Sequence, residues 1–450
     1  MSAAVHIVHC IDTEGPLFES LTAKFERIQE LFGIDGIAPT RANLEKLQRG
    51  EIDLAGREQA VMELLSSHRV NYNETWTELD IMLERITTPE FRSSRTDSAG
   101  NGWKYNWFCM DHVGYDYNPR RRDIGFHNIF DRYRELTAQQ AAAGDGLQWH
   151  FHPMSSHRDA HRCATHYLRD PVIFQILARK VIERGWFPSA YRAGFQAERP
   201  DSHWFLEQWI PFDISNMALD DNSELERSID LRNGRSADWR RAPSDWSAYH
   251  PDHDDYQRPG QCRRVIARCL NVLNRLASID EREMVKAFAR AAEGKPTLVG
   301  ICSHDWREMG AEVEHVRDLV DHAKALYPQV EVRFSEVVEA FRAVLWPNGV
   351  PEPALDLEVQ MHPAHDGDVP FIEVRTRSGK VFGPQPFLAI ETIGRQFLHD
   401  NFDFSPCGTR WFYAFHDDTL PLSQVARIGV AANDRFGNTC VRRLSPGKDC

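Results

Sequence analysis

The sequence predicts an α/β fold of seven strand–helix units, a barrel or a related open sheet, followed by a small all-β sandwich. Two observations support this prediction. Over residues 1–346, short apolar runs alternate with longer segments of helical periodicity, which is the pattern of βαβ units and a parallel sheet. After a Pro/Gly-rich linker at 347–353, residues 354–450 lose the helical periodicity and show strand-length alternations. A chain of 450 residues is long enough for two such domains.

Seven short apolar runs in the first domain are expected to form strands. They cover residues 4–11, 105–110, 147–152, 189–193, 212–215, 297–303 and 330–334. Helical patterns between them occupy 21–32, 126–136, 171–185, 261–276 and 312–327. Strands that alternate with helices favour a parallel sheet, and seven strands suit a barrel or a related open sheet.

The second domain is expected to be a β-sandwich, since sandwiches of this kind span roughly 100 residues. Strand-length alternations occur at 354–361, 370–382, 386–394, 409–417 and 425–438. The turns "SGK" (378–380) and "RFGN" (435–438) have the composition of hairpin turns. No residue of the sandwich has an assignable chemical role, so we expect a packing or interaction module.

Composition and charge narrow the class of protein. The formal net charge of −13 argues against nucleic acid as a partner, because phosphate binding requires a basic surface. The nine cysteines form no CxxC pair and are odd in number, which favours reduced thiols. We recognise no signal peptide, and no run of about 18 apolar residues predicts a membrane span. We therefore expect a cytoplasmic protein, and a homo-oligomer is compatible with the sequence.

Five of the 20 histidines crowd into the stretch "GLQWHFHPMSSHRDAHRCATH" at 146–166. His150 and His152 are two residues apart at the end of a predicted strand. Alternate residues of a strand point to the same face, so both imidazoles can aim at one place. With a carboxylate from elsewhere they would form a metal site. The alternative is a solvated loop with ordinary surface histidines.

Ionisable residues follow the other predicted strands as well. In parallel α/β folds the functional residues gather where the strands end at their carboxyl side. Reading these ends in order gives Asp12 and Glu14, Asp111 and His112, His150 and His152, Arg192, Asp213, and His304. Folding alone does not call for such a series, so we expect a site at this end of the barrel.

Four stretches of the sequence resemble the motifs of the polysaccharide deacetylases of the NodB-homology, carbohydrate esterase type. "IDTEGP" looks like the first motif in a D-x-E variant, and "HFHP" like an H-x-H-P version of the second. "YRAGFQAERPDSHWFLEQWIPFDISN" resembles the third and fourth motifs, and "ICSHDW" the last. Order and rough spacing agree over about residues 5–345. The resemblance implies a distorted, NodB-like (β/α)7 barrel.

The resemblance also implies a set of metal ligands. Glu14 matches the ligand acid of the first motif, one methylene longer than the usual aspartate. His150 matches the first histidine, and His152 is chosen as the second because strand geometry places it beside His150, with His157 as the alternative. Histidine and carboxylate ligands with open positions suit Zn²⁺, while Co²⁺, Fe²⁺ and Ni²⁺ are compatible.

The remaining motif residues map to catalytic roles. The resemblance makes Asp12 the general base, Arg192 the arginine that holds this base, and His304 the general acid. Asp213 matches the aspartate of the fourth motif. Asp305, which the usual pattern lacks at this place, is expected to tune or replace His304.

Each of these roles has a structural alternative. Asp12 and Glu14 would instead cap a helix beginning near Leu17, since acids favour helix N-termini. Arg192 would be a structural ion-pair partner of Asp213. His304 would be a buried core histidine with its hydrogen bonds satisfied.

Substrate contacts are expected from two regions. Asp111 and His112 follow the second strand and are placed in the pocket. The long insertion at 236–260 carries Trp239 and Trp246 among charged residues, which favours a loop that covers a sugar or sugar-acid substrate. A lid without substrate contact is the alternative.

The function that follows is metal-dependent hydrolysis of a C–N bond other than a peptide bond. The enzyme would remove an N-acetyl or other N-acyl group from a sugar in surface polysaccharide assembly, O-antigen or capsule. Since no export signal is recognised, we expect a nucleotide-linked or lipid-linked sugar as substrate. Hydrolysis of another C–N bond at the same site, or a catalytically silent carbohydrate-binding relative, are the alternatives.

Overall fold

The computed structural model describes residues 4–446 except 112–114, 117, 119–126, 154, 157, 160–165, 169–170, 224–236, 275 and 365–368. One sheet of eight strands is built from the first three quarters of the chain. Its strands are β1 (Ala4–Thr13), β2 (Tyr105–Asp111), β3 (Gly146–Phe151), β4 (Ala190–Ala193), β5 (Phe212–Asn216), β6 (Val265–Asn271), β7 (Thr297–His304) and β8 (Glu331–Phe334).

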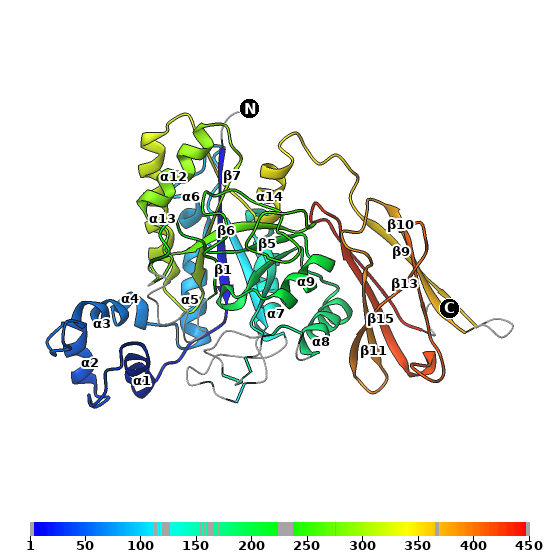
Figure 1. The fold of residues 1–450 in the computed structure, drawn as a ribbon, viewed down its shortest axis with the longest axis horizontal. Helices are drawn as coiled ribbons and strands as arrows, with labels where there is room; N and C mark the ends of the chain where they lie inside the picture. Colours follow the sequence, from blue (N-terminus) through cyan, green and yellow to red (C-terminus); the bar gives the residue numbers. More distant parts are fainter. Residues whose placement is uncertain are drawn as a thin grey trace.

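Strands β1 to β7 close into a parallel barrel. Each pairs with the next in order, and the ring closes because β1 pairs with β7 on one side and β2 on the other. The predicted seven-stranded barrel followed by antiparallel sheets is therefore confirmed, while its NodB type stays a prediction. In Figure 1 β1 runs downward, so the carboxyl ends of the strands lie at the lower edge of the barrel.

Two strand assignments need correction. The strand expected at 330–334 is β8, which pairs only with Ala4–Ile7 of β1 and is not part of the ring. Its place in the ring is taken by β6, inside the segment 261–276 for which a helix was expected. All seven residues of β6 are buried, so the strand shows no polar alternation that reveals its period.

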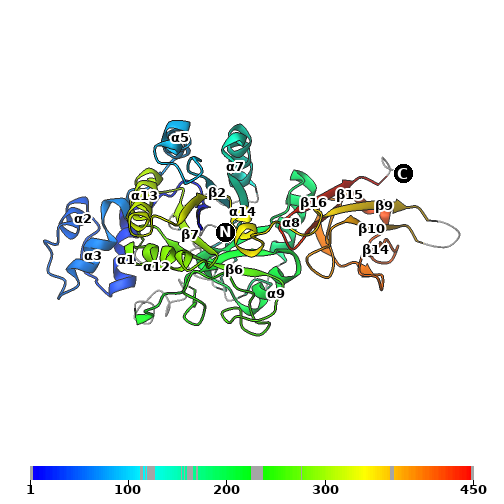
Figure 2. The same ribbon diagram turned by 90° about the horizontal axis from the view of Figure 1, so that it is seen from above.

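Helices surround the barrel, as Figure 2 shows for α5, α7, α12 and α13. The described helices are α1 (Leu21–Phe32), α2 (Arg41–Gln48), α3 (Glu58–Leu64), α4 (Ser67–Val70), α5 (Trp76–Ile86), α6 (Pro89–Ser93), α7 (Asn128–Gln139), α8 (Val172–Arg179), α9 (Pro200–Trp209), α12 (Glu281–Ala292), α13 (Met309–Leu326) and α14 (Val337–Leu345). None of these helices has the length and apolar content needed to cross a membrane.

The two ends of the barrel differ. At the amino end, α14 packs its buried face against the barrel interior, where Phe341 stacks on Phe212 at the start of β5. At the carboxyl side of β1, helices α1 to α4 form a projecting unit with its own small core, which includes Ile28, Leu47 and Val61. The amino end is thus closed by apolar packing, and the polar strand ends lie at the other.

The C-terminal domain consists of two antiparallel sheets. One contains β9 (Asp356–His362), β10 (Phe371–Ser378), β13 (Asp403–Phe404) and β14 (Arg410–Ala414), and the other β11 (Phe387–Thr392), β12 (Phe397–Asp400), β15 (Val425–Asn433) and β16 (Thr439–Leu444). The hairpin expected at "RFGN" is confirmed, since β15 pairs with β16. The hairpin expected at "SGK" is wrong, because β10 and β11 belong to different sheets.

One hydrophobic cluster belongs to both domains. Phe387 and Ala431 of the sandwich pack with Trp209 and other barrel-side residues in a common buried core. The side chain of Asn433 donates hydrogen bonds to the carbonyl oxygens of Pro188 and Trp209, at 2.7 and 2.8 Å. Figures 1 and 2 show α8 between the barrel and the sandwich.

Candidate metal and catalytic site

Four barrel strands bring the predicted site residues together. Asp12 lies near the end of β1 and Glu14 directly after it, and His150 lies near the end of β3 and His152 directly after it. Arg192 lies on β4, and His304 ends β7. Register pairs join them: Asp12 lies opposite His304, and His150 opposite Arg192. All except His304 are buried, and the side chain of His304 is 19% exposed. The alternative that Asp12 and Glu14 cap a helix beginning near Leu17 is wrong, because the next helix begins at Leu21 and is capped by Ser20.

Glu14, His150 and His152 form a compact group of three potential ligands. The Nε2 atoms of the two histidines are 2.8 Å apart. Oε1 of Glu14 lies 3.2 Å from Nε2 of His152 and 3.9 Å from Nε2 of His150. The Nδ1 atom of His150 lies 2.9 Å from the carbonyl oxygen of Arg192, so it carries the proton and leaves a lone pair on Nε2.

This donor set fits a divalent transition metal. Nitrogen and oxygen ligands lie about 2.0–2.2 Å from zinc, so two ligand atoms of one ion stand roughly 3 Å apart. Two of the three separations, 2.8 and 3.2 Å, are close to that spacing, and the third, 3.9 Å between Glu14 and His150, is longer. A histidine whose second nitrogen is tied to a backbone carbonyl is the usual arrangement for a metal ligand.

Asp12 lies beside this group and is held by Arg192. Nε of Arg192 donates to Oδ1 of Asp12 at 2.7 Å, and the guanidinium also donates to the carbonyl oxygen of Ile214. The thiol of Cys302 donates to Oδ2 at 3.4 Å. Burial pushes the pKa of Asp12 upward, but Arg192 and His150 outweigh it and hold this pKa below its ordinary value. The carboxylate is therefore kept ionised.

His304 faces the other oxygen of the same carboxylate. Its Nε2 atom lies 3.8 Å from Oδ2 of Asp12. Its ring packs against that of Trp306, with 4.6 Å between the ring centroids. Burial lowers the pKa of His304 to about 4, so the imidazole is neutral near pH 7. Asp12, Cys302 and His304 also form a second group of potential ligands. Cys302 was not identified from the sequence, where it reads as one more apolar strand residue.

Asp305 lies next to the candidate site and binds the segment that carries Glu14, and its expected effect on His304 stays a prediction. Its carboxylate is buried and accepts hydrogen bonds from the backbone of Glu14 and Gly15 and from the hydroxyl group of Tyr133. Burial raises the pKa of Asp305 to about 7. The hydrogen bonds of Asp305 hold the backbone segment that carries Glu14.

Asp213 lies on the strand next to that of Arg192, but its side chain belongs to a separate buried network. Its carboxylate pairs with Arg264, which also binds Glu198 at 2.9 and 3.0 Å. Burial and the nearby carboxylate of Glu198 raise the pKa of Asp213 well above its ordinary value. The alternative of an Arg192–Asp213 pair is wrong, since Arg192 binds Asp12 instead. Arg264 and Glu198 were not identified from the sequence.

The side chains proposed to contact substrate are deeply placed. Asp111 is buried, lies 3.1 Å from Nζ of Lys180 and accepts a hydrogen bond from Trp149. The rings of Trp239 and Trp246 are 0 and 1% exposed and pack in the core outside the barrel. Contact of these three residues with substrate stays a prediction. His112 and His157 lie outside the described residues.

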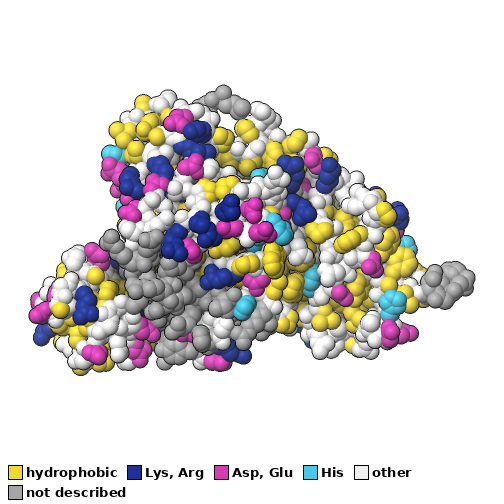
Figure 3. Space-filling view, viewed as in Figure 1, with side chains coloured by type: hydrophobic (Ala, Val, Ile, Leu, Met, Phe, Trp, Pro, Cys, Tyr) yellow, Lys and Arg dark blue, Asp and Glu magenta, His cyan; other side chains and the backbone are white. Residues whose placement is uncertain are grey.

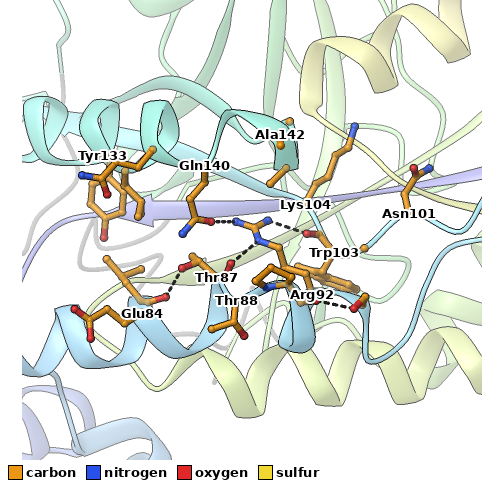
Figure 4. A pocket seen from close by; sticks show the side chains of 18 of the residues that line it. Glu84, Thr87, Thr88, Arg92, Asn101, Trp103, Lys104, Tyr133, Gln140 and Ala142 are labelled. Carbon is orange, nitrogen blue, oxygen red and sulfur yellow. Dashed lines mark hydrogen bonds between the residues drawn. The ribbon is translucent and has the colours of Figure 1, made fainter.

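A cavity of about 1170 Å³ lies elsewhere, between α5 and α7 (Figure 4). Arg92 forms part of its lining, and all five N–H donors of this arginine are used within the protein. They bind the carbonyl oxygens of Thr87 and Trp103, the side chain of Gln140 and both carboxylate oxygens of Asp145. This arginine therefore offers no free donor to a ligand.

The described surface, the cysteines and the comparisons with known proteins were considered together with the site residues. On the face drawn in Figure 3, acidic and basic side chains lie interspersed. The seven described cysteines all have free thiols. Comparisons of the chain with protein-family models, curated proteins and solved structures found no match.

Proposed function

We propose that this protein is a metal-dependent hydrolase that removes an N-acyl group, in the first instance N-acetyl, from a sugar of surface polysaccharide assembly. The observation that carries the proposal is the convergence of Glu14, His150 and His152 beside a carboxylate held by Arg192. The four stretches whose motifs resemble those of the polysaccharide deacetylases support the choice of substrate class.

The residues have complementary roles in amide hydrolysis. A bound Zn²⁺, or Co²⁺, Fe²⁺ or Ni²⁺, would polarise the amide carbonyl and lower the pKa of a water molecule. Asp12, kept ionised by Arg192, would take the proton of the attacking water. His304 lies 3.8 Å from Asp12, so this proton has a short route to Nε2 and from there to the leaving amine.

Metal content is the first test of the proposal. Wild-type protein is expected to hold about one transition metal ion per chain after incubation with Zn²⁺ or Co²⁺. The double variant His150→Ala, His152→Ala is expected to lose it. The matched control is His250→Ala, His253→Ala, which removes two histidines from an exposed segment and should keep the metal. Absence of metal from the wild type would contradict the proposal.

Activity separates the enzyme from a silent carbohydrate-binding relative. The wild type would be screened against N-acetylated nucleotide-linked and lipid-linked sugars, with formyl and cyclic amides as the second substrate class. Asp12→Asn is expected to lower kcat by about 10²–10⁴-fold, since this is the usual contribution of a general base, and to keep the metal. A chain that binds metal but hydrolyses none of these amides would be a silent relative.

A further inference from the structure

Asp305 and Trp306, the two residues that follow β7, both form hydrogen bonds with Glu14. The carboxylate of Asp305 accepts the N–H of Glu14 at 2.8 Å and the N–H of Gly15 at 3.0 Å, one on each oxygen. The hydroxyl group of Tyr133 donates to the same carboxylate at 2.7 Å. Gly15 has a φ of +75°, a conformation that glycine adopts without strain. The backbone that carries Glu14 is thus fixed by the strand end that carries His304.

The next residue, Trp306, binds the side chain of Glu14. Its indole Nε1 donates to Oε2 of Glu14 at 3.1 Å. The other oxygen, Oε1, is the one that lies 3.2 Å from Nε2 of His152. The two oxygens of this carboxylate therefore have different neighbours, an indole N–H for one and the histidine pair for the other.

The position of Trp306 is itself fixed by hydrogen bonds to Asn73. The backbone N–H of Asn73 donates to the carbonyl oxygen of Trp306 at 2.8 Å. Its side-chain amide donates to the carbonyl oxygens of Asp305 and Arg307 at 2.9 and 3.1 Å. The indole is 6% exposed and packs against the rings of His304 and Tyr72. Such packing leaves the indole little freedom to follow the carboxylate if the carboxylate moves.

We infer that Trp306 is a positioning residue that makes Glu14 a one-oxygen ligand. By holding Oε2, the indole directs Oε1 alone toward the ion shared with His150 and His152, and it offsets the extra methylene of glutamate. The inference rests on the proposed function. Two nitrogens and one oxygen leave positions open for water and substrate, and this donor set suits Zn²⁺ or Co²⁺ better than Mg²⁺ or Ca²⁺, which prefer oxygen ligands.

Metal affinity of the full-length chain tests the inference. Trp306→Phe removes the N–H and keeps an aromatic ring. We expect it to weaken the affinity for Zn²⁺ by about 10–100-fold, as loss of a partner of a metal ligand usually does. The d–d absorption of bound Co²⁺ should weaken as well, because a carboxylate that no longer accepts the indole N–H can bind through both oxygens and raise the coordination number. The matched control is Trp411→Phe. The buried Nε1 of Trp411 donates to the carbonyl oxygen of Pro384 in the sandwich, so this change should alter neither the Zn²⁺ affinity nor the Co²⁺ absorption.

A double-mutant cycle distinguishes positioning from general damage. Glu14→Asp withdraws the carboxylate by one methylene, so in this background Trp306→Phe should change the Zn²⁺ affinity by about threefold or less. If Trp306→Phe does not fold, the benzothienyl analogue of tryptophan at position 306 removes the N–H without changing the ring shape.

The outcomes distinguish failure of the proposed function from failure of the role assigned to Trp306. A wild type that binds neither Zn²⁺ nor Co²⁺ overturns the proposed function and the inference with it. A wild type that binds both, with unchanged affinity and Co²⁺ absorption in the Trp306 variants, overturns the inference alone. Equal losses of affinity in the wild-type and Glu14→Asp backgrounds would also overturn it, because they would show that Trp306 acts only on folding.

Discussion

One hydrogen bond decides how His150 can act. Because its Nδ1–H donates to the carbonyl oxygen of Arg192, its Nε2 faces Glu14 and His152 with a lone pair. Arg192 therefore serves the candidate site twice, through its backbone at His150 and through its guanidinium at Asp12. A change of its side chain alone tests only the second of these contacts.

The backbone beneath His152 requires a glycine at position 194. A Cβ atom there would lie 2.7 Å from the ring and 2.8 Å from Cα of His152, too close for van der Waals contact. Gly194→Ala should therefore push the imidazole away from Glu14 and weaken Zn²⁺ binding by about tenfold or more. Gly394→Ala, where the nearest atom is at 3.7 Å, is the control. Equal affinities in both variants would contradict this prediction.

His9 should make the stability of the protein depend on pH. Trp103 donates to its Nδ1, so Nε2 carries the proton and donates to Ser303. Burial, and then Arg317, lower the pKa of His9 to about 3, below the value of about 6.5 in the unfolded chain. Because only the unfolded state takes up the proton, stability is lost as pH falls below about 6.5, by about 2 kcal/mol at pH 5.

His9→Asn removes this titration and keeps an acceptor for Trp103. Urea unfolding of both proteins at about pH 7.5 and pH 5 measures the effect. The variant should be less stable throughout but lose about 2 kcal/mol less than the wild type between the two pH values. Parallel losses would mean that folded His9 titrates normally.

At the level of elements, the sequence predicts strand ends better than it predicts strands. Asp12, His150 and His304 were found because polar residues stand out after an apolar run. Strand β6 was missed, since Arg264 and Arg268 within or beside it suggest a helical face. Both arginines are buried in ion pairs outside the strand, Arg264 with Glu198, 66 residues away, and Arg268 with Glu283, 15 residues away. Such pairings leave no pattern within the strand itself.

The network at the start of β6 is expected to be important for stability. Arg264 is the buried partner of both Glu198 and Asp213, so Arg264→Met would leave two carboxyl groups in the interior without a cation. Removing one partner of a buried pair typically costs about 3–5 kcal/mol. Urea unfolding measures this loss, and the exposed neighbour Arg263→Ala should change stability by no more than about 0.5 kcal/mol. A small effect of Arg264→Met would show that the carboxyl groups are neutral in the folded protein.

At the level of the whole molecule, the sequence separates two parts that the structure joins. The change of pattern after residue 346 lies next to the end of α14 at Leu345. The sequence does not reveal that the sandwich completes the core around α8, because a residue buried between domains has the same composition as one buried within a domain. Phe387 and Trp209, 5.4 Å apart between ring centroids, are an example.

The shared core predicts that barrel and sandwich unfold together. Phe387→Ala should cost about 3–5 kcal/mol by leaving a cavity against Trp209 and Phe187. Pulsed hydrogen exchange along a urea titration reports the unfolding of β2 and of β15 separately. The urea midpoints of both strands should fall by the same amount, because the cavity destabilises a core that both domains need. Phe404→Ala, which truncates an exposed ring, should move neither. A fall confined to β15 would mean that the sandwich is an independent folding unit.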